Sequence, residues 1–149
     1  MVDTRTPEQR RKIMQAVKAK NTAPEWVVRR WLHSRGYRYR LHYKGLPGRP
    51  DIVMPRRMIA IFVHGCFWHS HSCKKGGPPK SGLDYWLPKL QTNVTRDADV
   101  RAKIRSIGWT VLTIWECETR DETIIESKLT EALSLPMPTS RAHLSRTRL

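Results

Sequence analysis

The sequence predicts an α/β fold in which a mixed central sheet is flanked by helices. Three observations support this prediction: two short apolar runs within residues 52–63 joined by a basic turn, a further apolar run at residues 109–115, and helical patterns before, between and after these runs. Helix, strands, strand and helix in this order are typical of a sheet with helices packed on its sides. The chain has 149 residues, the length of one compact domain.

The first element is a basic arm, expected at residues 1–20. Thr6 can cap a helix there, and Pro7 suits its first turn. The apolar stripe of this helix is narrow and consists of Ile13, Met14 and Val17. Because it has so little apolar surface, the arm is expected to pack weakly on the body of the protein or on DNA.

A second helix is expected at residues 22–35. Thr22 and Glu25 have the spacing of a capping box, and Gly36 is a stop signal. One side of this helix consists of Trp26, Val27, Arg30 and Trp31. The apolar residues of this side are expected to face the core.

Three stretches predict strands. Residues 37–43 read Tyr, Arg, Tyr, Arg, Leu, His, Tyr, a period-two pattern that fits a half-buried strand. Residues 52–54 and 58–63 are apolar and flank a basic turn, which predicts a central hairpin. Residues 109–115 form another apolar run and are expected to be a buried strand.

Two further helices complete the predicted fold. Residues 84–107 have a helical pattern that can break near Pro88. A last helix begins at Asp121, and its expected apolar face consists of Ile124, Ile125, Leu129 and Leu133. One domain at residues 21–135 is therefore expected to carry the chemistry, followed by a flexible basic tail at residues 136–149.

The charge balance favours a polyanionic partner. Lys and Arg total 28 against 13 Asp and Glu, a formal charge of +15. Nucleic acid is the first candidate, because phosphate neutralisation releases counterions. A generic basic surface of the kind found on ribosome-associated proteins is the alternative. No window is apolar enough for a membrane span, and the charged start differs from a signal peptide, so a cytoplasmic location is expected.

A cluster of cysteine and histidine predicts a structural zinc site. Cys66, His69, His71 and Cys73 fall within eight residues, and Cys117 follows the last predicted strand. Zinc is usually held by four such ligands in a tetrahedron. Five candidates for four places leave either His69 or His71 for another task. The alternative is a set of buried free cysteines and solvated histidines.

A second group of residues suits phosphodiester chemistry. Asp51 precedes the first strand of the hairpin and could hold magnesium together with a main-chain carbonyl of the next strand; alternatively, it only ends the turn after Pro50. His64 ends the second strand, and with His69 it could supply a base and an acid near a metal-bound phosphate.

Adjacent aromatic residues suggest contact with bases. Phe67 and Trp68 are neighbours in a polar loop, so both cannot readily be buried in one core. Exposed aromatic pairs in a basic protein can insert between base pairs. Trp86 could join them, or it could be an ordinary core or interface tryptophan.

These features come together in one resemblance. The run LPGRPDIVMPRRMIAIFVHGCFWHSHSC, with the later NVTRD and LTIWEC, resembles the very short patch repair endonucleases of bacteria. The resemblance covers roughly residues 5 to 135. It implies a fold similar to type II restriction endonucleases, structural zinc, catalytic magnesium, a monomer, and a nick on the 5′ side of the thymine in a thymine-guanine mismatch. Such mismatches arise when 5-methylcytosine deaminates.

The resemblance also implies roles for single residues. Asp51 and the main-chain carbonyl of Val63 would bind magnesium; the family commonly has Thr at the latter place, and a carbonyl does not depend on the side chain. His69 would be the general base, and His64 would contact the scissile phosphate. Glu25 and Asp97 would support the water on the magnesium and the His69 imidazole. The zinc ligands would be Cys66, His71, Cys73 and Cys117.

The DNA contacts are assigned in the same way. Phe67, Trp68 and Trp86 match the family's intercalating aromatics, and Met14, Lys89 and Asn93 match positions near the mismatched pair. The histidine run is shorter here, with Ser70 and Ser72, but neither position is needed as a ligand.

Two rival interpretations remain at this point. The chain could be a noncatalytic zinc module that binds DNA by charge and stacking, or a restriction-type nuclease that cuts matched sites. In the mismatch-endonuclease interpretation, mismatch-repair proteins are further candidate partners.

Overall fold

The computed structural model describes residues 6–9, 21–73, 76–77 and 79–138. Most of the predicted arm, including Met14, and the predicted tail beyond residue 138 lie outside these ranges. The described elements surround one four-stranded sheet, which confirms the predicted α/β class. Among the described residues, no helix is both long and apolar enough to cross a membrane.

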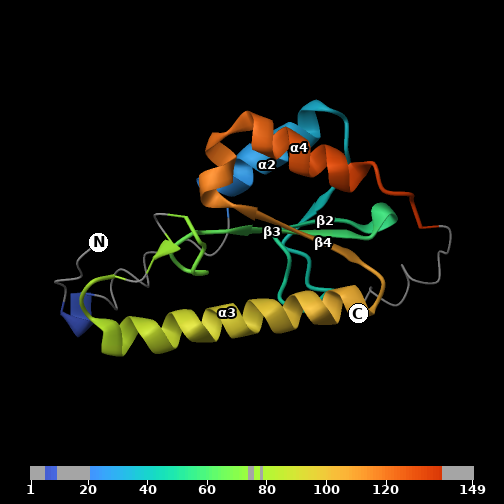
Figure 1. Cartoon of the computed structure of the whole chain (residues 1–149). Helices are drawn as coiled ribbons and strands as arrows, with labels where there is room; N and C mark the ends of the chain where they lie inside the picture. Colours follow the sequence, from blue (N-terminus) through green and yellow to red (C-terminus); the bar gives the residue numbers. More distant parts are fainter. Residues whose placement is uncertain (1–5, 10–20, 74–75, 78, 139–149) are drawn as a thin grey trace.

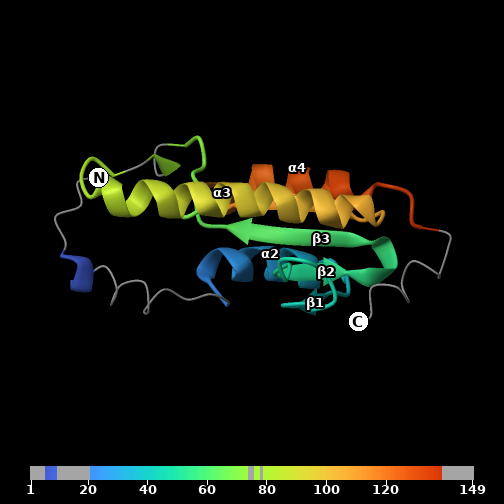
Figure 2. The same cartoon turned by 90° about the horizontal axis from the view of Figure 1, so that it is seen from below.

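The sheet has the strand order β1-β2-β3-β4 and is mixed. The predicted hairpin forms its centre: β2 (Ile52–Met54) and β3 (Ile59–His64) are antiparallel and joined by the short helix η1 (Pro55–Arg57). β4 (Thr110–Trp115) runs parallel to β3 along six residue pairs. Figure 2 shows β1, β2 and β3 in succession. The ends of β3 and β4 therefore lie side by side, and the loops that follow them start from the same edge.

Helices cover both faces of this sheet (Figure 1). α2 (Ala23–Ser34) and α4 (Glu122–Leu133) lie on one face, and α3 (Leu83–Ser106) lies on the other. Alternation along the strands separates two cores. The core under α2 and α4 consists of Val28, Leu32, Ile52, Met54, Ile59, Ile61, Ile114, Ile125, Leu129 and Ala132. The core on the α3 side consists of Leu46, Val53, Met58, Ala60, Phe62, Ile104 and Trp109.

The predicted inward side of α2 was wrong in part. Val27 and Trp31 pack half-buried against the core as expected, but its fully buried residues are Val28 and Leu32. Trp26 is 46% exposed and lies under the guanidinium of Arg29. The helix also buries Glu25, which pairs with Arg29 one turn later. Because these two charges neutralise each other, they can share the inward side with apolar residues.

Three further details differ from the predictions. β1 is only Arg40–Leu41, an edge strand paired with β2 over two residues. β4 is also an edge strand and is mostly half-buried rather than buried. α3 continues through Pro88, which lies near its start. In α4, Ile124 is 37% exposed, because the inward face is centred on Ile125 and Leu129.

Candidate active site and metal centre

The candidate site lies where β2 begins and β3 ends. Asp51 directly precedes β2, and the antiparallel pairing brings it beside Val63 near the end of β3. The Val63 N–H donates to Asp51 Oδ2 at 2.8 Å. The carboxylate is therefore fixed in a cleft lined also by His64, His69 and Asp97.

The turn before Asp51 is fixed by close packing on α3. Gly48 has φ +72°, and a Cβ at this position would lie 2.5 Å from Val100 Cγ1. Only glycine satisfies both the backbone conformation and the close approach without a shift of its neighbours. The turn at residues 47–50 is therefore held against α3, which gives the following residue, Asp51, a fixed position in the cleft.

Glu25 is the second carboxylate at this point. Its side chain is 2% exposed, and Asp51, Glu25 and His42 offer ligand atoms that all lie within 4.8 Å of one another. Burial, against the opposing hydrogen bond from Val63 and together with the nearby Glu25 carboxylate, raises the pKa of Asp51 to about 7. Two desolvated carboxylates at this distance form a hard oxygen environment that suits a divalent cation such as magnesium.

Arg29 and Asn21 both donate hydrogen bonds to the Glu25 carboxylate. Arg29 Nη2 donates to Glu25 Oε2 at 2.8 Å, and the Asn21 N–H donates to the same oxygen at 3.0 Å. His42 Nε2 lies 3.2 Å from Arg29 Nη2. We did not predict these three supports from the sequence. The i,i+4 spacing of Glu25 and Arg29 was a usable signal, whereas Asn21 and His42 come together only through the fold.

His69 and Asp97 form a second pair in the cleft. His69 Nδ1 lies 2.5 Å from Asp97 Oδ2, which comes from α3. Burial acts to raise the pKa of Asp97, but the hydrogen bond and the charge of His69 hold it below its usual value. An Nδ1–H that donates to this carboxylate leaves Nε2 as the proton-accepting atom. This tautomer is the one that a general base requires.

His64 is stacked on His69. The ring centroids are 3.8 Å apart and the planes differ by 6°. Burial, reinforced by the charge of His69, lowers the pKa of His64 to about 3. His64 is therefore uncharged at neutral pH. Of the two stacked imidazoles, His69 is the one that is hydrogen-bonded to a carboxylate, that of Asp97.

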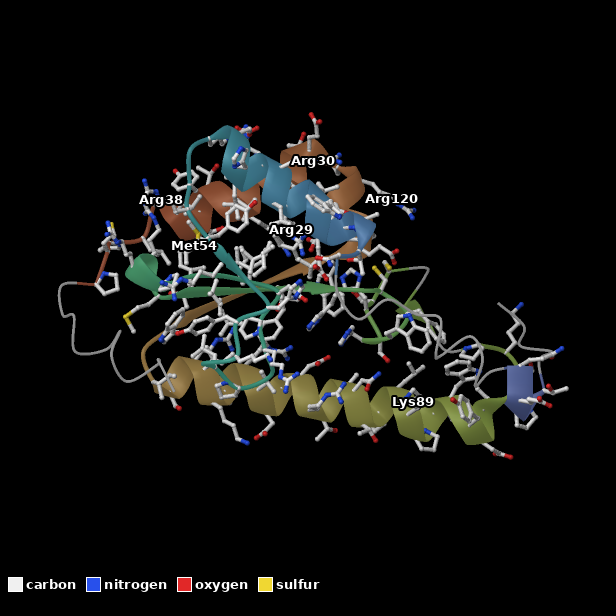
Figure 3. All side chains as sticks on the ribbon, turned by 180° about the vertical axis from the view of Figure 1, so that it is seen from behind. Arg29, Arg30, Arg38, Met54, Lys89 and Arg120 are labelled. Carbon is white, nitrogen blue, oxygen red and sulfur yellow. The ribbon has the colours of Figure 1, made fainter. Side chains whose placement is uncertain are left out.

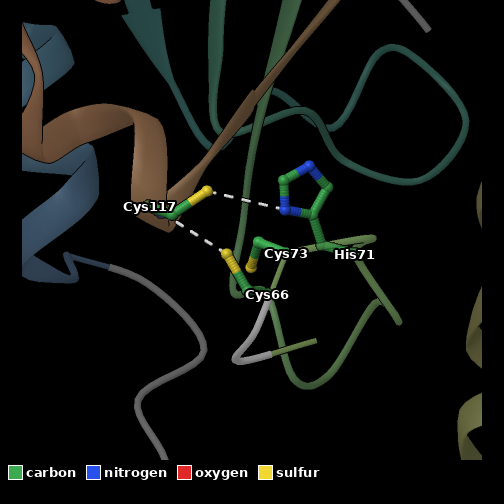
Figure 4. A group of neighbouring side chains, drawn as sticks. All are labelled: Cys66, His71, Cys73 and Cys117. Atoms are coloured by element: carbon green, nitrogen blue, oxygen red, sulfur yellow. Dashed lines mark hydrogen bonds between the residues drawn. The ribbon is translucent and has the colours of Figure 1, made fainter. Parts of the chain in front are cut away.

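The four predicted zinc ligands converge at the edge where β3 and β4 end (Figure 4). Cys66, His71, Cys73 and Cys117 offer ligand atoms within 4.8 Å of one another. The Cys117 N–H donates to Cys66 Sγ at 3.4 Å, and Cys117 Sγ lies 3.5 Å from His71 Nδ1. Three sulfurs and one imidazole nitrogen match the donors of a structural zinc site. His69 is not a member of this group.

The surroundings of the cluster fix its ligands. The His71 ring stacks on Trp115 at a centroid distance of 4.1 Å, and Trp115 is the last residue of β4. Burial raises the pKa of the Cys66 thiol to about 12. A bound metal cation would offset the cost of a buried thiolate at this place.

The three candidate wedge aromatics pack on one another. Phe67 and Trp68 are half-buried, and each meets the other and Trp86 edge to face at centroid distances of 5.1 to 5.8 Å. Trp86 itself is 4% exposed. Asn93 Nδ2 donates to the Trp68 carbonyl at 2.8 Å. Lys89 is half-buried on the same helix as Asn93 and lies near its start (Figure 3).

Comparisons with known proteins identify relatives of this chain. The family model for DNA mismatch endonuclease Vsr matches residues 2–75. The type II nicking enzyme V.XorIIP of Xanthomonas oryzae is 52% identical over 133 residues, which are 89% of this chain and 98% of that protein. The type II nicking enzyme V.NmeAIP of Neisseria meningitidis is 40% identical over 87% of this chain and 92% of its own length.

A third relative connects the chain directly to the family model. The DNA mismatch endonuclease Vsr of Escherichia coli is 37% identical over 134 residues, which are 89% of this chain and 86% of that protein. Identity at this level over most of both chains confirms the resemblance found in the sequence motifs. The chain therefore belongs to the family of DNA mismatch endonuclease Vsr and is a DNA endonuclease.

Proposed function

We propose that this endonuclease nicks double-stranded DNA on the 5′ side of the thymine in a thymine-guanine mismatch produced by deamination of 5-methylcytosine, and so starts very short patch repair. We further infer a restriction-endonuclease-like fold and a monomer acting in the bacterial cytoplasm, at the nucleoid. The supporting observation is that His69 is bonded to Asp97, stands outside the cysteine cluster, and lines the same cleft as Asp51.

Magnesium fits the residues around Asp51 in the cleft. Asp51 and the main-chain carbonyl of Val63 would bind it, and Glu25 would hold water beside it. When bound there, magnesium would neutralise negative charge on the scissile phosphate. Arg49, Arg96 and Arg101 line the same cleft and add positive charge for the flanking phosphates.

The side chains of His69, Asp97 and His64 have separate roles in the cleavage step. His69 accepts the proton of the attacking water at Nε2, while Asp97 accepts the Nδ1–H and steadies the imidazolium that forms. His64, neutral and stacked on His69, contacts the scissile phosphate beside the leaving oxygen. Zinc bound by Cys66, His71, Cys73 and Cys117 has no role in the chemical step and fixes the loop that carries His69.

The aromatic group gives a physical basis for mismatch selectivity. Phe67, Trp68 and Trp86 form a wedge that opens the duplex where pairing is already weak, so unstacking costs less there. Met14, Lys89 and Asn93 contact the mismatched pair. The hydrogen bond from Asn93 to the Trp68 carbonyl supports this proposal, because it couples the candidate reader to the wedge.

The decisive experiment compares two duplexes of the same sequence, one with a thymine-guanine mismatch and one fully paired, in the presence of magnesium. We expect a nick only in the mismatched duplex, 5′ to the thymine. Equal nicking of both duplexes would instead favour a nuclease that cuts matched sites. Asp51→Ala should bind the mismatched duplex and leave it intact; retained cleavage would refute the role of Asp51.

A further inference from the structure

A second cleft lies at the end of the sheet opposite the candidate active site. Its walls come from the segment that enters β1, from β1 itself, from the β2–β3 turn and from Met137 beyond α4. We name it the arginine cleft after the residues that define it: Arg38, Arg40, Arg56 and Arg57, with Tyr37, Tyr39 and Tyr43. Among the residues that the structure describes, none of those that line it is acidic.

The cations of this cleft are available to a ligand. Arg38, Arg40 and Arg56 are exposed, and within the described ranges no carboxylate lies at ion-pair distance from them. Arg57 is held in place, because its Nη1 donates to the Leu133 carbonyl at 3.3 Å and its guanidinium lies 5.3 Å from the Tyr37 ring. The cleft thus combines three exposed cations with one that is already oriented.

Its position separates it from the active site. β3 runs from the β2–β3 turn to His64, and six residues of strand span about 17 Å. In Figure 3, Arg38 and Met54 lie beside the turn, at the opposite end of the molecule from Lys89. The four arginines therefore contribute nothing to the metal or the base in the active-site cleft.

We propose that the arginine cleft is a binding site for the phosphodiester backbone of nucleic acid. Planar guanidinium groups bind two phosphate oxygens at once, and tyrosine hydroxyls are common donors to phosphate. The chain is a DNA endonuclease, so DNA is the polyanion that it meets. The proposal deepens the proposed function, because a contact about 17 Å from the cut would anchor the protein independently of the mismatch.

Two sources could supply this backbone: the flank of the duplex being cut, or a second stretch of DNA. A different explanation of the same arginines is that charged side chains protect the edge strand β1 from pairing with other chains. That explanation predicts no contribution of the cleft to DNA binding beyond the one expected from net charge.

The test compares R38Q/R40Q/R56Q with R30Q/R105Q/R120Q, which removes three exposed arginines outside the cleft and gives the same net charge. Binding to a fully paired duplex of about 30 base pairs is measured by fluorescence anisotropy in EDTA from about 50 to 300 mM salt. A hairpin duplex of about four base pairs, about 14 Å long and so too short to span the roughly 17 Å between the clefts, is titrated in parallel. Circular dichroism melts establish that both variants are folded.

We expect the cleft variant to lose about ten- to a hundredfold in affinity for the long duplex at 100 mM salt, with a salt slope shallower by about 2 to 3 than that of the control variant. If the cleft holds the flank of the same duplex, binding of the hairpin is unchanged. If it holds a second molecule, the wild type binds two hairpins and the cleft variant binds one. Equal slopes and affinities of the two variants, with one hairpin bound by each, would overturn the proposal.

The measurement is independent of the proposed mismatch reaction. It uses paired DNA without magnesium, so a failure to nick thymine-guanine mismatches would leave its outcome unchanged. Conversely, a saturating concentration of mismatched duplex should be nicked by the cleft variant at the wild-type single-turnover rate, since its active-site residues are intact.

Discussion

Arg29 and Glu25 form a buried ion pair one helical turn apart, with Arg29 Nη2 2.8 Å from Glu25 Oε2 and both side chains at most 4% exposed. The pair lies on the side of α2 that faces Asp51, so the Glu25 carboxylate belongs both to the packing of the helix and to the lining of the cleft. A buried charge of this kind is stable only together with its partner.

Arg29→Met should therefore destabilise the protein by about 3 kcal/mol, because it leaves the Glu25 carboxylate buried and unpaired. The double variant Glu25→Leu/Arg29→Met should recover most of that loss in urea unfolding while remaining impaired in nicking. A double variant no more stable than the single one would show that the ion pair is not the source of the effect.

Asp51→Asn should raise stability in EDTA at pH 8. The folded-state pKa of Asp51 is about 7, above its usual value of 3.8, so the wild type loses stability as the pH rises through this range. The amide has no charge to desolvate and can still accept from the Val63 N–H. We expect a gain of about 1 to 3 kcal/mol at pH 8 that shrinks toward pH 5, measured by thermal unfolding across that range. A gain independent of pH would contradict the desolvation of Asp51.

His64→Gln should flatten the acid side of the stability profile. The pKa of His64 is lowered to about 3 in the folded protein from 6.5, so this residue contributes stability that is complete above pH 6.5 and lost as the pH falls. Between pH 6.5 and 5, the wild type should lose about 1 kcal/mol per pH unit more than the variant. The check is urea unfolding of both proteins at matched pH, and parallel profiles would be the contrary result.

His71→Ala should lose zinc, whereas His69→Ala should keep it. Only His71 stands in the cluster with the three cysteines, and His69 faces Asp97. Metal content of the purified proteins, determined by mass spectrometry, separates the two cases. Zinc retained in His71→Ala and missing in His69→Ala would exchange their roles.

Asp97→Asn should slow nicking about 10- to 100-fold with little change in DNA affinity, because the His69 ring would lose the acceptor that fixes its tautomer. Single-turnover nicking and anisotropy on the same mismatched duplex give the two quantities. Asp99→Asn, two residues away and exposed on the same helix, is the control and should behave as wild type. A large loss of affinity in Asp97→Asn would indicate a binding role instead.

Local pattern was sufficient to predict the central hairpin and a cluster of cysteine and histidine. The hairpin at residues 52–63 is apolar and interrupted by one basic turn, and three members of the cluster, Cys66, His71 and Cys73, are close in the sequence. Which histidine belongs to the cysteine cluster came from the family resemblance rather than from the spacing.

The errors concern features that depend on distant parts of the chain. The buried side of α2 was misjudged in part, because a sequence pattern treats Glu25 and Arg29 as exposed charged residues. Their burial depends on the ion pair that they form. The strand at residues 37–43 shortened to Arg40–Leu41 because an edge strand forms only where its single neighbour offers hydrogen bonds. The position of His42 beside Arg29 depends on this edge, and no pattern in the sequence marks it.

The cysteine cluster joins the loop after β3 to the residues after β4, and His69 lies between two of its ligands, Cys66 and His71. If the cluster binds zinc as proposed, the base reaches its working position only after the ion has been captured. A newly synthesised chain would then be unable to cut DNA until it binds zinc. Activation of the nuclease would depend on zinc uptake and not on DNA binding.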